Sequence, residues 1–150
     1  MKVAIGSDHR GITLKDAIKK ILVSRSYDVD DMGAMTADSV DYPDYAYKVA
    51  EGVSKDLYDY GVLICGSGIG MSIAANKVVN IRAALCMSPE LARLSRMHNN
   101  ANILVLGADY TDMDTLELLL TNFFTTKFEE DRHMKRVQKI TDIETKFLKK

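Results

Sequence analysis

The amino-acid sequence predicts an α/β fold, a three-layer sandwich with a five-stranded, mostly parallel sheet and a C-terminal helical arm. Four short apolar runs and one run that is more polar, each typical of a strand, alternate along the 150 residues with segments whose apolar side chains recur at helical spacing. This alternation is typical of parallel strands joined by right-handed helical crossovers. The run 62–64 is apolar throughout, as expected of a strand covered on both faces. With 47% hydrophobic residues, the chain can bury a core without disulfides, and we expect one domain over 1–150.

The first half of the chain predicts two strands and two helices. Residues 2–7 form a strand that ends in a polar loop, and residues 27–32 form a more polar strand at a sheet edge. Between them, the capping box Thr13-x-x-Asp16 predicts the start of a helix. After a long loop over 33–42, Pro43 suits the first position of the next helix. The positions expected to be buried on these helices are Leu14, Ala17, Ile18, Ile21, Leu22, Ala46, Val49, Ala50 and Val53.

The second half repeats the alternation. Strands are predicted at 62–65, 81–86 and 103–106, each followed by a helix. These helices begin near Met71, at the Ser88-Pro89 cap and at the capping box Thr111-x-x-Asp114. From residue 132 onward only a narrow apolar stripe remains among many charges. We therefore expect this last helix to pack on a small surface or on a partner subunit. The stripe consists of Met134, Val137, Ile140 and Phe147.

Composition excludes several classes of function. Twenty basic and twenty-one acidic residues give a net charge of -1, which does not favour nucleic-acid or membrane-surface binding. No apolar segment approaches the roughly 20 residues that span a bilayer, so we expect a cytoplasmic protein. Cys65 and Cys86 form no C-x-x-C pair, and neither a disulfide framework nor a metal site is predicted. We expect no cofactor.

The stretch from Cys65 to Gly70 is the strongest candidate for a site. Gly66, Gly68 and Gly70 follow a buried strand and precede a helix, an arrangement that turns backbone N–H groups toward an anion. The spacing does not fit a dinucleotide-binding loop, and no Lys-Ser/Thr pair completes a nucleotide triphosphate loop. A thiol phosphatase loop would carry an arginine at position 71, which is methionine.

Each candidate side chain has a structural alternative. Cys65 beside this loop favours a chemical role over a packed thiol, whereas Cys86 favours the core. His98 can serve in catalysis or bind the last carbonyls of its helix, and His9 and His133 carry the same ambiguity. Arg132 and Arg136 lie on one helix face as a phosphate-binding pair or as a solvated surface. We expect four polar groups to converge with Cys65 on one sheet edge, namely Asp8, His9, His98 and Asn99.

Five blocks, in chain order, resemble the type B ribose-5-phosphate isomerase family. The related isomerases of allose 6-phosphate and galactose 6-phosphate share its architecture. The blocks are Gly6-Ser7-Asp8-His9, residues 41–46 (DYPDYA), residues 65–77 (CGSGIGMSIAANK), residues 93–102 (RLSRMHNNAN) and Arg132-His133. The resemblance implies Rossmann-like subunits in a homodimer, with a dimer of dimers left open. It also implies metal-independent interconversion of ribose 5-phosphate and ribulose 5-phosphate in the non-oxidative pentose phosphate pathway.

The resemblance also implies roles for individual residues. His98 matches the acid/base that opens the sugar ring, Cys65 matches the base that moves a proton between C2 and C1, and Ser67 assists proton transfer between oxygens. The backbone of Gly66, Ser67, Gly68, Ile69 and Gly70 matches an anion hole for the enediolate. The other residues matched to substrate binding are Asp8, His9 and Asn99, with Arg132 and Arg136 holding phosphate from the neighbouring subunit.

Two departures from the family pattern involve three residues. Asp109 stands where an arginine that helps bind phosphate is usual, and Glu130-Asp131 replace two glycines. We expect Asp109 either to point away from the site or to orient Arg132 or Arg136 of a partner chain. The alternatives in function are an isomerase of a six-carbon sugar phosphate, with loop 33–42 setting pocket size, and a non-catalytic module that binds a sugar phosphate.

Overall fold

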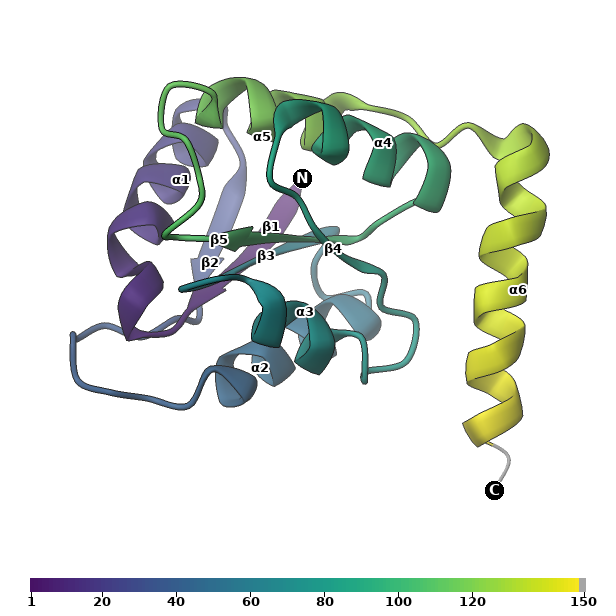
Figure 1. Ribbon diagram of the computed structural model, residues 1–150, viewed down its shortest axis with the longest axis horizontal. Helices are drawn as coiled ribbons and strands as arrows, with labels where there is room; N and C mark the ends of the chain where they lie inside the picture. The colour runs from purple at the N-terminus through teal and green to yellow at the C-terminus, as the bar shows by residue number, and fades with distance from the viewer. Residues whose placement is uncertain (149–150) are drawn as a thin grey trace.

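The structure, a computed structural model that describes residues 1–148, contains a five-stranded sheet in which all strands are parallel (Figure 1). The strand order is β2 (Asp28–Asp31), β1 (Lys2–Ser7), β3 (Tyr60–Cys65), β5 (Ile103–Gly107) and β4 (Ala83–Leu85). The polar strand β2 lies at an edge, as its composition predicts. The apolar strands β1, β3 and β5 lie in the middle, where both faces are covered. The predicted α/β class and parallel sheet are confirmed.

Two layers of helices cover the sheet (Figure 1). On one face, α1 (Ile12–Ser24), α4 (Pro89–Asn99) and α5 (Leu116–Thr125) pack against alternate side chains of the central strands. On the other face, α2 (Tyr42–Ser54) and the short α3 (Ile69–Ala75) pack against the remaining side chains. The alternation of strand side chains between faces supplies two separate cores. Cys86 lies in the first core, as predicted.

Both predicted Thr-x-x-Asp capping boxes are wrong as helix starts. Helix α1 begins at Ile12, because the 3₁₀ helix η1 (His9–Gly11) leads directly into it. Helix α5 begins at Leu116 instead of after Thr111, whose Oγ1 donates to the Gly107 carbonyl at 2.8 Å. In contrast, the cap at Ser88 is confirmed, since its Oγ accepts the Leu91 N–H at 3.3 Å.

A buried ion pair fixes the loop between β2 and α2. Lys15 is only 1% exposed, and its Nζ donates to Asp31 Oδ1 at 3.0 Å and to the Ala34 carbonyl at 2.8 Å. Burial by itself raises the pKa of Asp31, but the Gly33 N–H and Lys15 outweigh it and hold that pKa below its usual range. The ion pair therefore ties the end of β2 and the start of the loop to α1.

We expect Lys15→Met to lower the free energy of unfolding by about 3 kcal/mol, because the substitution leaves the Asp31 carboxylate in a largely buried site without its main cation. Urea denaturation measures this loss. Lys19→Met is the matched control, since Lys19 also contacts Asp31 but is 40% exposed. A depressed carboxyl pKa stabilises the protein above about pH 4 and ceases to do so as pH falls through the folded-state value. The difference between wild type and Lys15→Met should therefore shrink in acid, and a constant difference would contradict this explanation.

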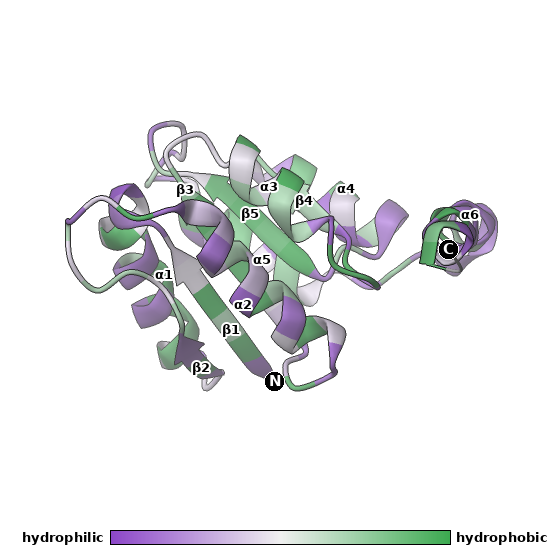
Figure 2. Ribbon diagram, turned by 90° about the horizontal axis from the view of Figure 1, so that it is seen from below, coloured by the Kyte–Doolittle hydropathy of each residue, from purple (hydrophilic) through white to green (hydrophobic). Residues whose placement is uncertain are grey.

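The last helix, α6 (Glu130–Leu148), stands away from the sandwich as an arm (Figures 1 and 2). The backbone kinks at Asp131, where φ is -21° and ψ is -115°. His133 and Val137 are buried near the start of the arm, whereas most of its apolar stripe is exposed. Its exposed members are Met134, Ile140 and Phe147, and the apolar side chains of Ile143 and Leu148, outside the predicted stripe, are exposed as well. The predicted stripe thus has little cover within residues 1–148.

Candidate active site

The glycine loop joins β3 to α3 at the carboxyl edge of the sheet. Gly68 has φ +76°, a left-handed conformation that favours glycine. A Cβ atom there would lie 2.5 Å from Leu85 Cδ1, so a side chain would also clash. The turn brings the Gly68 N–H to 3.2 Å from Cys65 Sγ. The sulfur is therefore held in place by the loop that follows it.

Cys65 lines a cavity of about 680 Å³ at this edge, a volume suitable for a small molecule. Cys65 itself is 5% exposed, so its sulfur lies at the buried end of the site. The cavity is lined by Asp8, Arg10, Tyr42, Cys65, Gly66, Ser67, Ile69, Gly70, Ile73, Asp109 and Tyr110. Of the residues that the sequence singles out, Asp8 and most of the glycine loop are thus brought together.

Three neighbours fix the shape of the loop. Asp8 Oδ1 accepts the N–H groups of Arg10 and Gly11 at 3.0 and 3.1 Å, which caps η1 beside the cavity. The Tyr42 ring lies so close to Gly70 that a Cβ there would be 2.5 Å from it. The Ile69 N–H donates to Ser67 Oγ at 3.3 Å. The backbone of the loop therefore approaches a ligand with little freedom to move.

His9 faces a different segment from Asp8. Its Nδ1 accepts the Val40 N–H at 3.3 Å, and the ring is half-buried. This bond ties η1 to the loop over 33–41, and His9 is not among the residues that line the cavity. Within one chain, His9 supports the loop beside the site.

The expected convergence of His98 and Asn99 with Cys65 is wrong for a single chain. These residues end α4 beside Arg82, whose Nε donates to the Asn100 carbonyl at 2.9 Å. Arg82 precedes β4, so this end of α4 lies at the amino edge of the sheet. The five residues of β5 separate the two edges by about 13 Å. Neither residue lines the cavity.

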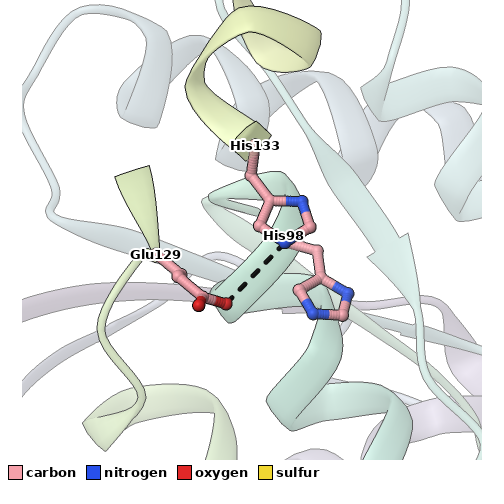
Figure 3. Close-up of side chains that lie close together, drawn as sticks. All are labelled: His98, Glu129 and His133. Carbon is pink, nitrogen blue, oxygen red and sulfur yellow. Dashed lines mark ion pairs between the residues drawn. The ribbon is translucent and has the colours of Figure 1, made fainter. Parts of the chain in front are cut away.

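His98 instead forms a cluster with residues at the start of the arm (Figure 3). Its ring stacks on His133, with centroids 4.2 Å apart and planes 19° from parallel. Arg132 Nε donates to His133 Nε2 at 3.4 Å, and Glu129 Oε2 lies 3.7 Å from the same nitrogen. Burial lowers the pKa of His133, and the nearby His98 and Arg132 add to this effect. His133 is therefore neutral at pH 7.

The same cluster contains a set of metal-ligand atoms that sequence spacing did not reveal. The ligand atoms of His98, Glu129 and His133 lie within 4.8 Å of one another. However, the lone pair of an imidazole nitrogen lies in the ring plane, and two stacked, nearly parallel rings cannot direct their lone pairs at one ion. Arg132 also donates to His133 Nε2. This geometry fits a stacked polar pair and does not fit a metal centre.

One of the two expectations for Asp109 is wrong, since Asp109 lines the cavity and does not point away from it. Within one chain its carboxylate accepts a hydrogen bond from Arg10 Nη2, and the orientation of a partner's Arg132 or Arg136 stays a prediction. Sequence reasoning overlooked Arg10, although it follows Asp8 and His9 directly. The lining residues Tyr42, Ile73 and Tyr110 were also missed. Ligands of parallel sheets bind at the carboxyl edge, so the loops that follow β1 and β5 could have indicated Arg10 and Tyr110 from the sequence.

Together, these features define a parallel α/β protein with a buried thiol beside a glycine loop suited to a small anion. The family model described as Ribose/Galactose Isomerase matches residues 3–140, and the chain belongs to this family. It is therefore a sugar-phosphate isomerase of the family. No helix within residues 1–148 is long and apolar enough to cross a membrane.

Individual relatives match over nearly their whole length. Ribose-5-phosphate isomerase B of Escherichia coli is 42% identical, over 95% of this chain and 96% of the relative. The structure of ribose-5-phosphate isomerase B from Clostridium thermocellum has a TM-score of 0.95 and 48% identity, over 98% and 99% of the two chains. The Mycoplasma genitalium enzyme with bound ribulose-5-phosphate has a TM-score of 0.92 and 39% identity, over 96% of each chain.

Proposed function

We propose that the protein interconverts D-ribose 5-phosphate and D-ribulose 5-phosphate through an enediolate. The observation that carries this proposal is the Cys65 sulfur, buried at the end of a cavity and held by the Gly68 N–H in the glycine loop. A base at this position needs an adjacent anion hole, because removal of a proton beside a carbonyl places negative charge on the carbonyl oxygen. The ribulose-5-phosphate bound to the Mycoplasma genitalium relative supports a five-carbon substrate.

The proposed reaction starts from the open-chain aldose. Cys65, as a thiolate, removes the proton from C2, and the electron pair moves into a C1–C2 double bond while the carbonyl electrons move to O1. Backbone N–H groups of the glycine loop stabilise the O1 oxyanion. Ser67, which lines the same cavity, carries a proton between O2 and O1. Cys65 then returns its proton to C1, and the carbonyl forms at C2, so no atom or electron is gained or lost.

The remaining catalytic groups are proposed to come from a second copy of the chain. His98 and Asn99 lie at the amino edge of their own sheet, together with Arg132 at the start of the arm. The apolar side chains of Met134, Ile140 and Ile143 on α6 are exposed, and a partner surface would cover them. In an isologous homodimer, this stripe would be covered, and His98, Asn99, Arg132 and Arg136 would reach the partner's cavity. There His98 would open the sugar ring and the arginines would hold phosphate. The proposed homodimer is also compatible with a dimer of dimers.

A coupled assay tests the proposed substrate directly. We expect turnover of ribose 5-phosphate to exceed turnover of allose 6-phosphate, because the Mycoplasma genitalium relative holds a five-carbon sugar phosphate, ribulose-5-phosphate. A preference for allose 6-phosphate would support the six-carbon alternative. Exchange of the C2 proton of ribose 5-phosphate with deuterated water separates both reactions from binding alone, since a binding module would produce no exchange.

We expect prolonged dialysis against a chelator such as EDTA to leave isomerase activity unchanged, because the enediolate is stabilised by backbone N–H groups in the proposed reaction. Rates before and after dialysis, with metal content measured on the same samples, check this expectation. A loss of activity that Zn²⁺ or another divalent ion restores would contradict it. Such a result would direct attention to the His98, Glu129 and His133 cluster.

A further inference from the structure

An ion pair on the wall of the cavity joins two loops that are far apart in sequence. Arg10 belongs to η1, after β1, and Asp109 follows β5. Arg10 Nη2 donates to Asp109 Oδ2, and the Asp109 N–H donates to the Gly66 carbonyl at 3.0 Å. The two side chains are 57% and 47% exposed. An ion pair this exposed contributes little to folding stability, so its place beside the glycine loop calls for a different explanation.

The glycine loop leaves space for the Arg10 guanidinium. A Cβ atom on Gly66 would lie 2.8 Å from Arg10 Cζ, 2.9 Å from Nη1 and 3.0 Å from Nε. A Cβ at this position would displace the flexible Arg10 side chain, so glycine lets the guanidinium lie directly against the loop. Gly66 is also the residue after Cys65. Arg10 is therefore held on the wall of the cavity from two sides, by Asp109 and by the glycine loop.

Within residues 1–148, Arg10 is also the one basic residue among those that line the cavity. Two carboxylates line it as well, but neither is left uncompensated. Asp8 accepts two backbone N–H groups, and Asp109 accepts from Arg10. A phosphorylated sugar that enters one chain's cavity therefore meets a single positive charge. Without Arg10, it would meet only the negative charges of the two carboxylates.

The guanidinium has free donors for such a ligand. Only Nη2 takes part in a hydrogen bond to a residue within 1–148, which leaves Nε and Nη1 available. A guanidinium offers these donors in a planar fork that matches phosphate oxygens. Cys65 is buried whereas Arg10 is exposed, so the reacting carbons would lie deep and the phosphate at the mouth. A doubly charged group is stabilised there, because water still reaches it.

We propose that Arg10 is the residue of this chain's own cavity that binds the substrate phosphate, and that Asp109 is its positioning residue. The proposal rests on the sugar-phosphate isomerase function proposed above. It assigns Arg10 a role beside that of Arg132 and Arg136, which would arrive from a second copy. It also explains why a carboxylate lies beside a site for an anion, since Asp109 holds the Arg10 guanidinium in place instead of facing the phosphate.

Steady-state kinetics of Arg10→Ala test the assignment. We expect the KM for ribose 5-phosphate to rise about 10- to 100-fold, the loss typical of a charged hydrogen bond, with kcat changed less than about threefold. Inorganic phosphate, as a competitive inhibitor, should weaken by a similar factor. Arg25→Ala is the matched control, because it removes the same charge at the other end of α1. An unchanged KM in Arg10→Ala, or an equal rise in Arg25→Ala, would overturn the proposal.

Two further variants separate the roles of the pair. Asp109→Asn should raise the KM several-fold while Arg10 is present, and a lower KM would show that Asp109 competes with substrate instead of positioning Arg10. The double variant Arg10→Ala/Asp109→Arg moves the cation to the neighbouring position on the same wall, and we expect it to recover most of the lost affinity. No recovery would overturn the phosphate-binding role. Absence of turnover in the wild-type protein would instead refute the proposed function, which keeps the two failures distinct.

Discussion

Replacement of Cys65 by alanine is expected to abolish isomerisation while substrate binding persists. In the proposed reaction, Cys65 moves the proton between C2 and C1, and a positioned base of this kind contributes about 10²- to 10⁴-fold to the rate. The sulfur makes one hydrogen bond, from the Gly68 N–H at 3.2 Å, so its loss leaves the rest of the cavity in place. We therefore expect kcat to fall about 1,000-fold or more, with ribose 5-phosphate binding measured by calorimetry changed less than about threefold.

Cys86 provides the matched control for this experiment. It lies in the core, and burial raises the pKa of its thiol to about 11, so it stays protonated at pH 7. Cys86→Ala should leave turnover within about twofold of wild type, at a modest cost in stability from the lost buried sulfur. Near-normal turnover in Cys65→Ala would refute the proposed base. A loss of substrate binding equal to the loss of rate would show that Cys65 holds the sugar instead.

The sequence predicts strands better than helix starts, for physical reasons that the two capping boxes illustrate. The central strands β1, β3 and β5 are apolar runs that can be recognised from their own residues. The box at Thr13 fails because Asp8 caps η1, and the chain is already helical before Thr13 is reached. The box at Thr111 fails because the Thr111 hydroxyl donates to the Gly107 carbonyl. A cap depends on which backbone group is nearby, and tertiary structure decides that.

The glycine loop could be predicted because all its parts are contiguous. The left-handed backbone of Gly68 is a local consequence of a turn after a buried strand, whereas its close contact with Leu85 of β4 is not. The position of His98 follows from topology that the sequence also predicts, since a helix between two parallel strands ends at their amino edge. The Arg10–Asp109 pair was beyond sequence reasoning, because it joins residues 99 positions apart and their loops meet only through the strand order.

The position of His98 leads to the second large effect, which we expect in mixed dimers. His98→Asn should reduce turnover of ribose 5-phosphate about 100-fold, since ring opening loses its acid/base. If His98 and Cys65 of one site come from different chains, a heterodimer of Cys65→Ala and His98→Asn chains contains one doubly altered site and one intact site. Heterodimers purified through two different affinity tags should then recover about half of the wild-type activity, because a twofold axis relates two equivalent sites.

A second heterodimer makes this experiment decisive. Cys65 and Ser67 line the same cavity of one chain. In a heterodimer of a Cys65→Ala chain and a Ser67→Ala chain, each of the two cavities therefore carries one substitution. Neither site is intact, and we expect no recovery beyond the residual activity of the single variants. If the mixture of Cys65→Ala and His98→Asn also fails to recover, His98 does not complete the partner's site. Recovery in that mixture alone requires the arrangement in which the amino edge of one sheet, carrying His98 beside α6, faces the carboxyl edge of the other, where Cys65 ends β3.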